Sequence, residues 1–277
     1  HGSMLLYSLL YLSGYKSISV EDIKKFRQLN SICAGHPEYK EGSGIETTTG
    51  PLGQGLGNAV GMAIAEEVYR KKFGSSLINN KTYVIASDGD LMEGVSHEAM
   101  SLAGHLKLKN LIVFFDNNKI SIDGSTSLSV SDNYKKRFES YNWEFLEIDA
   151  HNEKQISKAI SKASKSNKPT LISCKSIIGF GSPNKSGKAS SHGSPLGEEE
   201  IALVRKKLKW KYKPFEIPKD ILDAWEKIGE KGELLEKKWQ EIINKKNPQI
   251  KSKLEKTYNK TELEDLESLI EKQKTKY

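Results

Sequence analysis

The chain has 277 residues, of which 36% are hydrophobic, 8% aromatic and 29% charged. This length allows one large or two ordinary domains with a substantial core, and the composition fits a soluble globular protein. The longest apolar runs are far shorter than the roughly 20 residues of a membrane-spanning helix, so we expect no membrane partner, and no signal peptide is visible.

The formal net charge of +7 and the pI near 9.0 raise the question of an anionic partner such as nucleic acid. The lysines, however, are interleaved with glutamates along the helical segments, as where three glutamates at 198–200 precede the basic residues 205–207. This pattern is typical of solvated helix faces. We therefore expect no nucleic-acid partner.

The cysteine content points to the compartment. Cys33 and Cys174 are the only two cysteines and lie far apart in the sequence. Neither a disulfide framework nor a zinc cluster is indicated, and we expect a cytoplasmic protein.

The first part of the chain is predicted to be helical. Residues 4–15 indicate a buried helix, and Ser19 with Asp22 three positions later indicates the N-cap of a second helix, ending near Asn30. Residues 58–73 predict a further helix, whose small side chains allow close packing against a sheet.

A long glycine-rich loop is expected over residues 31–57, and loops of this length are usually functional or disordered. Its last part, Thr48–Gly55, leads into a helix. Free N–H groups and the positive end of the helix dipole suit a phosphate there, although the pattern alone is weak. It is neither a Walker loop nor a dinucleotide-binding fingerprint.

Two apolar runs, Tyr83–Ala86 and Leu111–Phe115, predict buried parallel strands separated by a helix at 96–107. Ligands bind beyond the carboxyl ends of such strands, where Asp88 and Asn118 should emerge side by side. Carboxylate and amide oxygens suit Mg²⁺ or Ca²⁺. Alternatively, Asp88 only caps the next helix.

The alternation of strands and helices continues through the second half of the chain, with helices at 132–141 and 153–165 and strands at 144–148 and 170–174. We therefore predict an α/β fold with a doubly wound, mostly parallel sheet flanked by helices. A second glycine- and serine-rich loop follows at 179–197.

The remainder of the chain is expected to be helical. From residue 218 onward it is rich in lysine and glutamate. The apolar residues expected to dock this helix are Trp225, Leu235, Trp239 and Ile243. We predict a domain over residues 1–215 and a helical C-terminal extension over residues 216–277.

Three histidines, His1, His36 and His192, lie in glycine-flanked segments without periodicity. Histidines in loops can bind phosphate or hydroxyl groups and transfer protons near neutral pH. A surface histidine without a function is the alternative for each of them.

Together these motifs resemble the transketolase family over nearly the whole chain, in order and in spacing. The matching motifs are Gly35-His36-Pro37-Glu38, Thr47–Gly55, Ser87-Asp88-Gly89 with Asn118, and Ser191–Leu196. The similarity is to the N-terminal, diphosphate-binding domain of this thiamine-diphosphate enzyme. The family also has a His-Gly pair at the position of His1, which favours a native residue over a cloning remnant.

The resemblance implies a cofactor site. A divalent cation, Mg²⁺ or alternatively Ca²⁺ or Mn²⁺, would be bound by Asp88, by the Asn118 side chain and by the backbone carbonyl of Ile120. The cofactor diphosphate would contact His1, Gly89 and His192, and Gly50 would line the site through its backbone.

The resemblance also assigns roles around the reacting atoms. Leu52, Ile120 and Ile122 would pack against the cofactor rings, and His36 would bind the hydroxyls of the donor ketose. We expect His36, His192 and His1 to be the catalytic histidines. Glu93 and Glu98 would lie in a carboxylate network near a subunit interface.

The implied activity is the transfer of a two-carbon ketol group from a ketose phosphate to an aldose phosphate in the pentose phosphate pathway. Dihydroxyacetone synthase, deoxyxylulose-phosphate synthase and a non-catalytic interaction module are alternatives. A complete transketolase has further domains, so we expect the chain alone to be inactive. A homodimer or a complementary subunit would supply the pyrimidine-binding domain.

The chain departs from the family pattern at three positions. Ser87 and Ala34 replace the usual Gly and Pro, and Asp90 adds an acid beside the expected metal. Ser87 is tolerable if its backbone does not need a positive φ. We expect Asp90 to point to solvent or to cap the helix.

Overall fold

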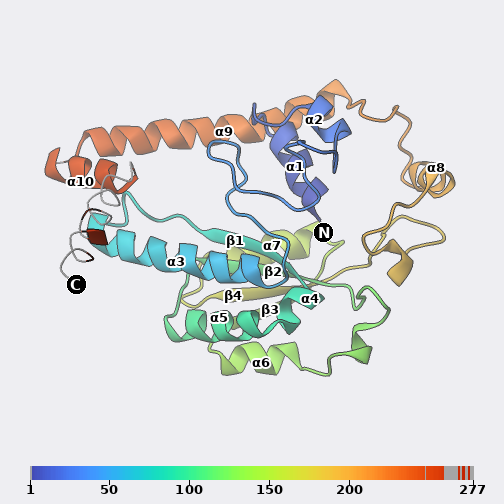
Figure 1. Ribbon diagram of the computed structural model, residues 1–277, viewed down its shortest axis with the longest axis horizontal. Coiled ribbons are helices and arrows are strands. Elements are labelled where there is room, and N and C mark those ends of the chain that lie inside the picture. The colour runs from blue at the N-terminus through green and yellow to red at the C-terminus, as the bar shows by residue number, and fades with distance from the viewer. Residues whose placement is uncertain (1, 247, 259–267, 269, 272–273, 275–277) are drawn as a thin grey trace. The chain divides into compact units, whose positions relative to one another are not determined.

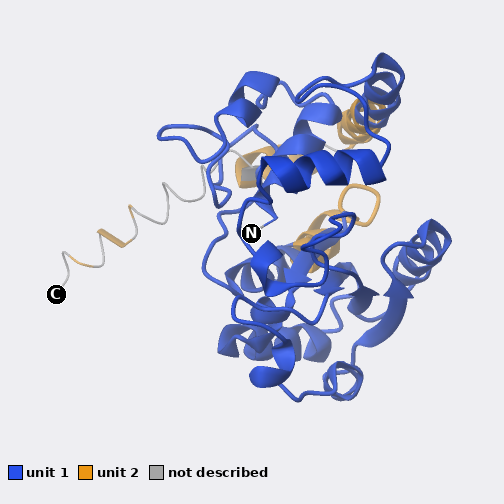
Figure 2. Cartoon of the chain, turned by 90° about the vertical axis from the view of Figure 1, so that its right-hand side faces the viewer, with its two compact units in different colours: residues 1–65, 80–229 blue, residues 66–79, 230–277 orange. Residues whose placement is uncertain are grey.

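The structure is a computed structural model and describes residues 2–246, 248–258, 268, 270–271 and 274. The chain divides into two compact units (Figure 2), of which the first comprises residues 1–65 and 80–229 and the second residues 66–79 and 230–277. None of the described helices combines the length and the apolar composition that crossing a membrane requires.

The first unit is built on a four-stranded sheet in the order β1-β2-β4-β3 (Figure 1), in which every pair of neighbours is parallel. The strands are β1 (Thr82–Ser87), β2 (Leu111–Asn117), β3 (Glu144–Asp149) and β4 (Thr170–Lys175). All four predicted strands are confirmed, each extended by one or two residues. Their carboxyl ends therefore lie at one edge of the sheet.

One face of the sheet is covered by α3 (Gln54–Phe73), α5 (Gly94–His105) and α6 (Tyr134–Ser140). Met100 of α5 and Phe138 of α6 are fully buried against Phe115 of β2. Helix α3 begins four residues before the predicted start, because Gln54 already belongs to its first turn.

The opposite face is covered by α7 (Glu153–Ala163), whose Ala159 and Ala163 pack against Ile112 of β2 and Ile172 of β4. Consecutive residues of β2 point to opposite faces, so Leu111 and Val113 join the first core and Ile112 joins the second. Helices on both faces of a parallel sheet confirm the doubly wound α/β fold.

Strand β1 is less buried than predicted. Tyr83 is 53% exposed and Ile85 67%, whereas Val84 and Ala86 pack into the core on the other face. The reason is the position of β1 at the edge of the sheet, while α7 packs on the residues of β2, β3 and β4. The prediction of a buried strand is thus wrong for this face of β1.

The N-terminal helices are α1 (Ser3–Leu12) and α2 (Val20–Lys24). Ser19 and Asp22 form the capping box expected for α2. The helix ends earlier than predicted, because Arg27 and Asn30 both adopt a φ of 62° in the left-handed region.

Three helices follow the sheet, namely α8 (Glu198–Lys207), α9 (Lys219–Asn244) and α10 (Pro248–Tyr258). In the second unit, Ile243 and the half-buried Trp239 pack with Leu254 and Phe73, which confirms two predicted docking residues. Leu235 is also predicted to dock this helix, but its side chain is 66% exposed and does not pack in this cluster.

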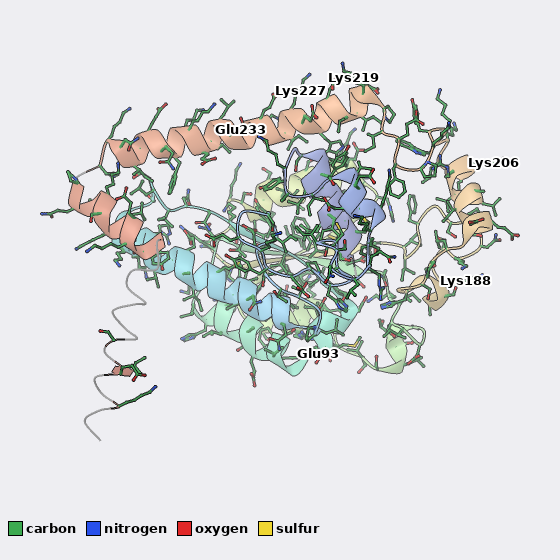
Figure 3. All side chains as sticks on the ribbon, turned by 45° about the horizontal axis from the view of Figure 1, so that its top comes forward. Glu93, Lys188, Lys206, Lys219, Lys227 and Glu233 are labelled. Atoms are coloured by element: carbon green, nitrogen blue, oxygen red, sulfur yellow. The ribbon has the colours of Figure 1, made fainter. Side chains whose placement is uncertain are left out.

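Most basic residues of α8 and α9 point into solvent, whereas Arg205 is half-buried. Lys206, Lys219 and Lys227 are exposed and project from the ribbon (Figure 3). The exposure of these lysines agrees with the solvated helix faces predicted from the charge pattern, whereas Glu200 of the same pattern is buried.

Candidate functional site

The site begins where β1 and β2 end. The two strands pair in parallel with Ser87 opposite Asp116, so that Asp88 and Asn118 follow neighbouring strands at almost the same depth. This confirms the predicted juxtaposition of the two strand ends. Asp88 is also the first residue of a short helix, α4 (Asp88–Met92), which the sequence reasoning did not predict.

Asp88 is a buried acid whose carboxylate lacks a hydrogen-bond partner of ordinary geometry in the described part of the chain. It is 2% exposed, and neither carboxylate oxygen accepts a hydrogen bond of ordinary geometry from the described residues. Burial raises the pKa of Asp88 to about 6, although the positive charge and backbone N–H of Lys119 act in the opposite direction. Asp116 adds a smaller upward contribution to this pKa.

The side chain of Asn118 is oriented by its own neighbours. Its Nδ2 donates to Asp116 Oδ2 at 3.2 Å, and its Oδ1 accepts from the backbone N–H of Ile120 at 2.9 Å. The chain turns between these residues at Lys119, whose φ is 65°. The backbone of Ile120 is thereby held against Asn118.

These groups fit a divalent cation. The two unpartnered oxygens of Asp88 and the amide oxygen of Asn118 are the hard donors that Mg²⁺ and Ca²⁺ prefer. Within the described parts of the chain, no three His, Cys, Asp or Glu residues gather as a metal cluster. A cation here would therefore have one carboxylate ligand and neutral oxygens, which leaves positions for water or phosphate.

Asp90 connects the strand end to the first glycine loop. Its Oδ2 accepts from the backbone N–H and from the hydroxyl of Ser87, both at 2.8 Å, and its Oδ1 accepts from the N–H of Gly53 at 3.0 Å. Asp90 thus caps α4, which confirms one of the two orientations expected for its side chain. Ser87 has a φ of −99°, so serine meets no backbone strain there.

The first glycine loop brings several predicted site residues together. Leu52 covers Gly89, where an added Cβ would lie 3.1 Å from Leu52 Cδ1. An added Cβ on Gly50 would lie 3.3 Å from the ring of His36. The backbone N–H of Thr49 donates to the Pro37 carbonyl at 3.1 Å, which joins the two loop segments.

Other predicted residues lie further out. Ile122 is 67% exposed, at the turn after Ile120. His192 is half-buried in the loop between β4 and α8. Glu93 and Glu98 are exposed, and their role near a subunit interface stays a prediction. His1 lies outside the described residues.

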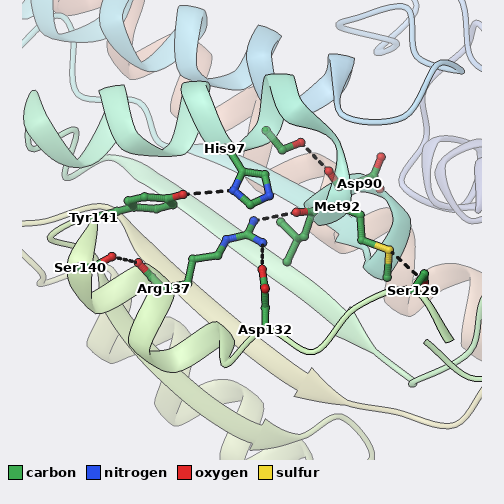
Figure 4. A network of polar contacts seen from close by, with 10 residues as sticks. Asp90, Met92, His97, Ser129, Asp132, Arg137, Ser140 and Tyr141 are labelled. Carbon is green, nitrogen blue, oxygen red and sulfur yellow. Dashed lines mark hydrogen bonds and ion pairs between the residues drawn. The ribbon is translucent and has the colours of Figure 1, made fainter. Parts of the chain in front are cut away.

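The structure also identifies residues that no sequence motif marks. Arg137 donates to the Leu91 carbonyl at 2.7 Å and pairs with Asp132 at 3.1 Å, which ties α6 to the end of α4 (Figure 4). In the same view His97 Nδ1 lies 3.2 Å from the hydroxyl of Tyr141. In the sequence Arg137 looks like any basic residue on a solvated helix face, so its spacing does not indicate these contacts.

A cavity of about 460 Å³ opens beside the strand ends, lined by Asn117, Lys119, Asp132, Asn133, Tyr134, Lys135, Phe145, Glu147 and Ser173. Burial is the main cause that raises the pKa of Tyr134 to about 12, and the charge of Asp88 adds to it. Tyr134 is therefore electrostatically coupled to Asp88. No pattern in the sequence pointed to this tyrosine.

Comparison with known proteins gives one family. The family model described as "Transketolase, thiamine diphosphate binding domain" matches residues 1–263. A transketolase from Buchnera aphidicola is 55% identical over 268 residues, which covers 94% of this chain and 40% of that protein. Transketolase 2 from Escherichia coli is 52% identical over 258 residues, which covers 90% of this chain and 38% of that protein.

Solved structures agree with the sequence comparison. The crystal structure of transketolase from Campylobacter jejuni matches with a TM-score of 0.87 at 45% identity, over 91% of this chain and 39% of that one. The chain thus spans about 40% of the length of the relatives that it matches. The chain belongs to the transketolase family and corresponds to its thiamine diphosphate binding domain.

Proposed function

We propose that this chain is the cofactor-binding part of a transketolase, which transfers a two-carbon ketol group from a ketose phosphate to an aldose phosphate. The observation that carries the proposal is the buried, unpartnered carboxylate of Asp88 beside Asn118, at the carboxyl ends of two parallel strands. In a metal-free chain this arrangement is unfavourable, because a buried carboxylate lacks compensation for its lost hydration. A bound cation supplies that compensation.

The proposed cation is Mg²⁺, with Ca²⁺ or Mn²⁺ as substitutes, and its protein ligands are Asp88, Asn118 Oδ1 and the carbonyl of Ile120. The remaining positions would be taken by water and the cofactor diphosphate. Bound thiamine diphosphate supplies the carbon nucleophile and the electron sink for cleaving the bond in the ketose.

The other site residues bind, orient and transfer protons in this proposal. His1, Gly89 and His192 contact the diphosphate, and Gly50 leaves its backbone open to the cofactor. Leu52, Ile120 and Ile122 exclude water from the cofactor rings. His36 is the residue proposed for the substrate hydroxyls, and its exposed side chain beside Gly50 supports this role.

The complete active site would need more protein than this chain. We propose a homodimer, or a complementary subunit, that supplies a pyrimidine-binding domain, with residues 1–215 as the cofactor domain and 216–277 as the extension toward that pyrimidine-binding domain. Sugar phosphates of the pentose phosphate pathway would be the substrates, and the cytoplasm is the proposed compartment. The isolated chain is expected to show no transketolase turnover in a steady-state assay, and measurable turnover would contradict this.

Titration calorimetry with thiamine diphosphate tests the site, with and without Mg²⁺. The wild-type chain is expected to bind the cofactor only when Mg²⁺ is present, and Asp88→Asn is expected to abolish this dependence. Asp123→Asn is a matched control, because Asp123 is an exposed acid a few residues beyond Asn118. Equal Mg²⁺-dependent binding by the wild type and by Asp88→Asn would overturn the proposal.

A further inference from the structure

Glu200 is an acid whose burial the sequence does not reveal. It lies in the first turn of α8 beside Glu198 and Glu199, and both of these are exposed. Glu200 is only 7% exposed. Three consecutive acids at a helix N-terminus would ordinarily act on the helix dipole from solvent, whereas the third one here turns inward.

The carboxylate of Glu200 binds the beginning of the second glycine loop. Its Oε1 accepts from the hydroxyl of Ser182 and from the backbone N–H of Asn184, the latter at 2.8 Å. Its Oε2 accepts from the side-chain amide of Asn184 at 2.8 Å. A single ionised side chain therefore satisfies two side-chain donors and one backbone donor of this turn and holds it against α8.

From this turn, direct contacts lead to His192. The hydroxyl of Ser182 also accepts from the backbone N–H of Lys185 at 3.1 Å. The carbonyl of Lys185 accepts from the hydroxyl of Ser191 at 2.5 Å, and Ser191 immediately precedes His192. Glu200, Ser182, Lys185 and Ser191 thus form a continuous series of hydrogen bonds that ends beside the histidine.

Two further contacts close the same loop. The ammonium of Lys185 donates to the carbonyl of Leu196 at 2.9 Å, on the far side of His192. Gly179 passes so close to Ser191 that an added Cβ would lie 2.7 Å from its Oγ. The segment carrying His192 is therefore bound on both sides, and Glu200 is the charged group at its base.

We propose that Glu200 is a positioning residue, which fixes the loop of residues 182–192 so that His192 is preorganised to bind the diphosphate of the cofactor. The inference rests on the proposed function for the role of His192. The fixing of the loop by Glu200 stands on the hydrogen bonds alone and can be tested without a cofactor.

The charge of Glu200 is required because all three groups that it binds are donors. The hydroxyl of Ser182, followed by the amides of Asn184, lowers the pKa of Glu200 to about 2, so the carboxylate stays ionised at neutral pH. A glutamine would place one of its own donors against these donors and lose part of the set. An aspartate keeps the charge but is shorter by one methylene.

Hydrogen–deuterium exchange and NMR on the full 277-residue chain, without cofactor, provide the direct test. In Glu200→Gln, the amides of Asn184 and Lys185 are expected to exchange at least about tenfold faster, because the hydrogen bonds that they donate to Glu200 and Ser182 are weakened. The ring signals of His192, assigned with His192→Ala, are expected to move. Glu200→Asp should have a smaller effect, and the exposed control Glu199→Gln should have none.

Unchanged loop exchange and unchanged His192 signals in Glu200→Gln would overturn the proposal. If Glu200→Gln also accelerates exchange in the central strand β2, the substitution destabilises the whole chain. The amide exchange of the loop in the milder variant Glu200→Asp then decides whether Glu200 fixes the loop. Loop exchange in Glu200→Asp equal to that of the wild type would in that case count against the proposal.

Calorimetry with thiamine diphosphate and Mg²⁺ separates positioning from general support of the fold. Glu200→Gln should weaken binding about tenfold in the wild-type background but change it little in His192→Ala, since coupled residues are non-additive. An equal loss of cofactor affinity in both backgrounds would overturn the proposal that Glu200 acts on binding through His192. If His192→Ala itself binds like the wild type, the proposed role of His192 fails, and the exchange data still decide whether Glu200 fixes the loop.

Discussion

Asp90 Oδ1 accepts a hydrogen bond from the backbone N–H of Gly53 at 3.0 Å, across 37 positions of sequence. The other oxygen of Asp90 caps α4 through Ser87. One carboxylate therefore joins the end of β1 to the glycine loop that begins α3. The acid that departs from the family pattern beside the proposed metal site is bound to the protein rather than directed at a diphosphate.

The contacts of Asp90 lead to a stability prediction. Asp90→Ala removes a helix cap and leaves the N–H of Gly53 without its acceptor, which together should lower the free energy of unfolding by about 2–3 kcal/mol. Asp123→Ala, at an exposed acid, should change it by less than about 0.5 kcal/mol. Urea unfolding followed by circular dichroism measures both, and equal midpoints would contradict the assigned role of Asp90.

The raised pKa of Asp88 predicts a pH dependence of stability in the metal-free chain. Its pKa is about 6 in the folded state against 3.8 for the free group, so the unfolded state loses this proton first as the pH rises. Below about pH 4 Asp88 contributes nothing to the pH dependence of the free energy of unfolding, because it is protonated in both states. Between pH 4 and 6 the free energy of unfolding falls as the pH rises. Above pH 6 the full penalty of roughly 3 kcal/mol remains.

We expect stability to fall as the pH rises, and this can be checked by unfolding the wild type and Asp88→Asn from pH 4 to pH 8 in the presence of a chelator. The difference between the two proteins should grow in favour of the asparagine variant up to about pH 6 and then stay constant. Mg²⁺ at pH 8 should stabilise only the wild type. Parallel profiles, or equal stabilisation of both by Mg²⁺, would refute the assignment.

Gly104 on α5 leaves no room for a side chain. An added Cβ would lie 1.7 Å from the backbone carbonyl oxygen of Tyr141, and backbone cannot move aside as a flexible side chain does. Gly104→Ala should therefore destabilise the chain by about 3 kcal/mol or more.

Gly61→Ala is the matched control for this substitution. Gly61 lies within α3 with open space around its added Cβ, so alanine there should stabilise the chain by about 0.5–1 kcal/mol through helix propensity. Thermal unfolding of both variants gives the comparison. A neutral Gly104→Ala would show that α5 and Tyr141 are not packed this closely.

Trp239 is expected to stabilise the second unit, and Leu235 on the same helix is not. The indole N–H of Trp239 donates to the Leu77 carbonyl at 2.8 Å, and its ring packs with Phe73 and Ile243. Trp239→Ala should cost about 2–4 kcal/mol and accelerate amide exchange in residues 69–78. Leu235→Ala should do neither, and an equal effect of the two substitutions would contradict the packing.

Much of the site was predictable from local sequence. Asp88 and Asn118 each follow a short apolar run, and parallel strands always end at the same edge, so their proximity needed only the strand assignment. Ser19 with Asp22, whose cap depends on a spacing of three residues, was predictable for the same reason. In these cases the physical cause operates within a few residues of sequence.

Other features depended on neighbours that are distant in sequence. The exposure of Tyr83 and Ile85 follows from the edge position of β1, because a strand at the edge and one at the centre can have the same apolar pattern. The early end of α2 depends on left-handed backbone at Arg27, a conformation that the residue type arginine does not favour.

The sequence by itself determined the alternation of strands and helices, the polar residues at the strand ends and the membership of the family, because these are encoded by periodicity and motif order. Only the tertiary structure decided which acids are buried. Asp88, Asp90 and Glu200 are each an acid near the start of a helix, yet the first is unpartnered, the second caps α4 and binds Gly53, and the third binds the turn before His192. The difference arises because the partner of a carboxylate is set by the packing of remote segments, not by its own spacing in the chain.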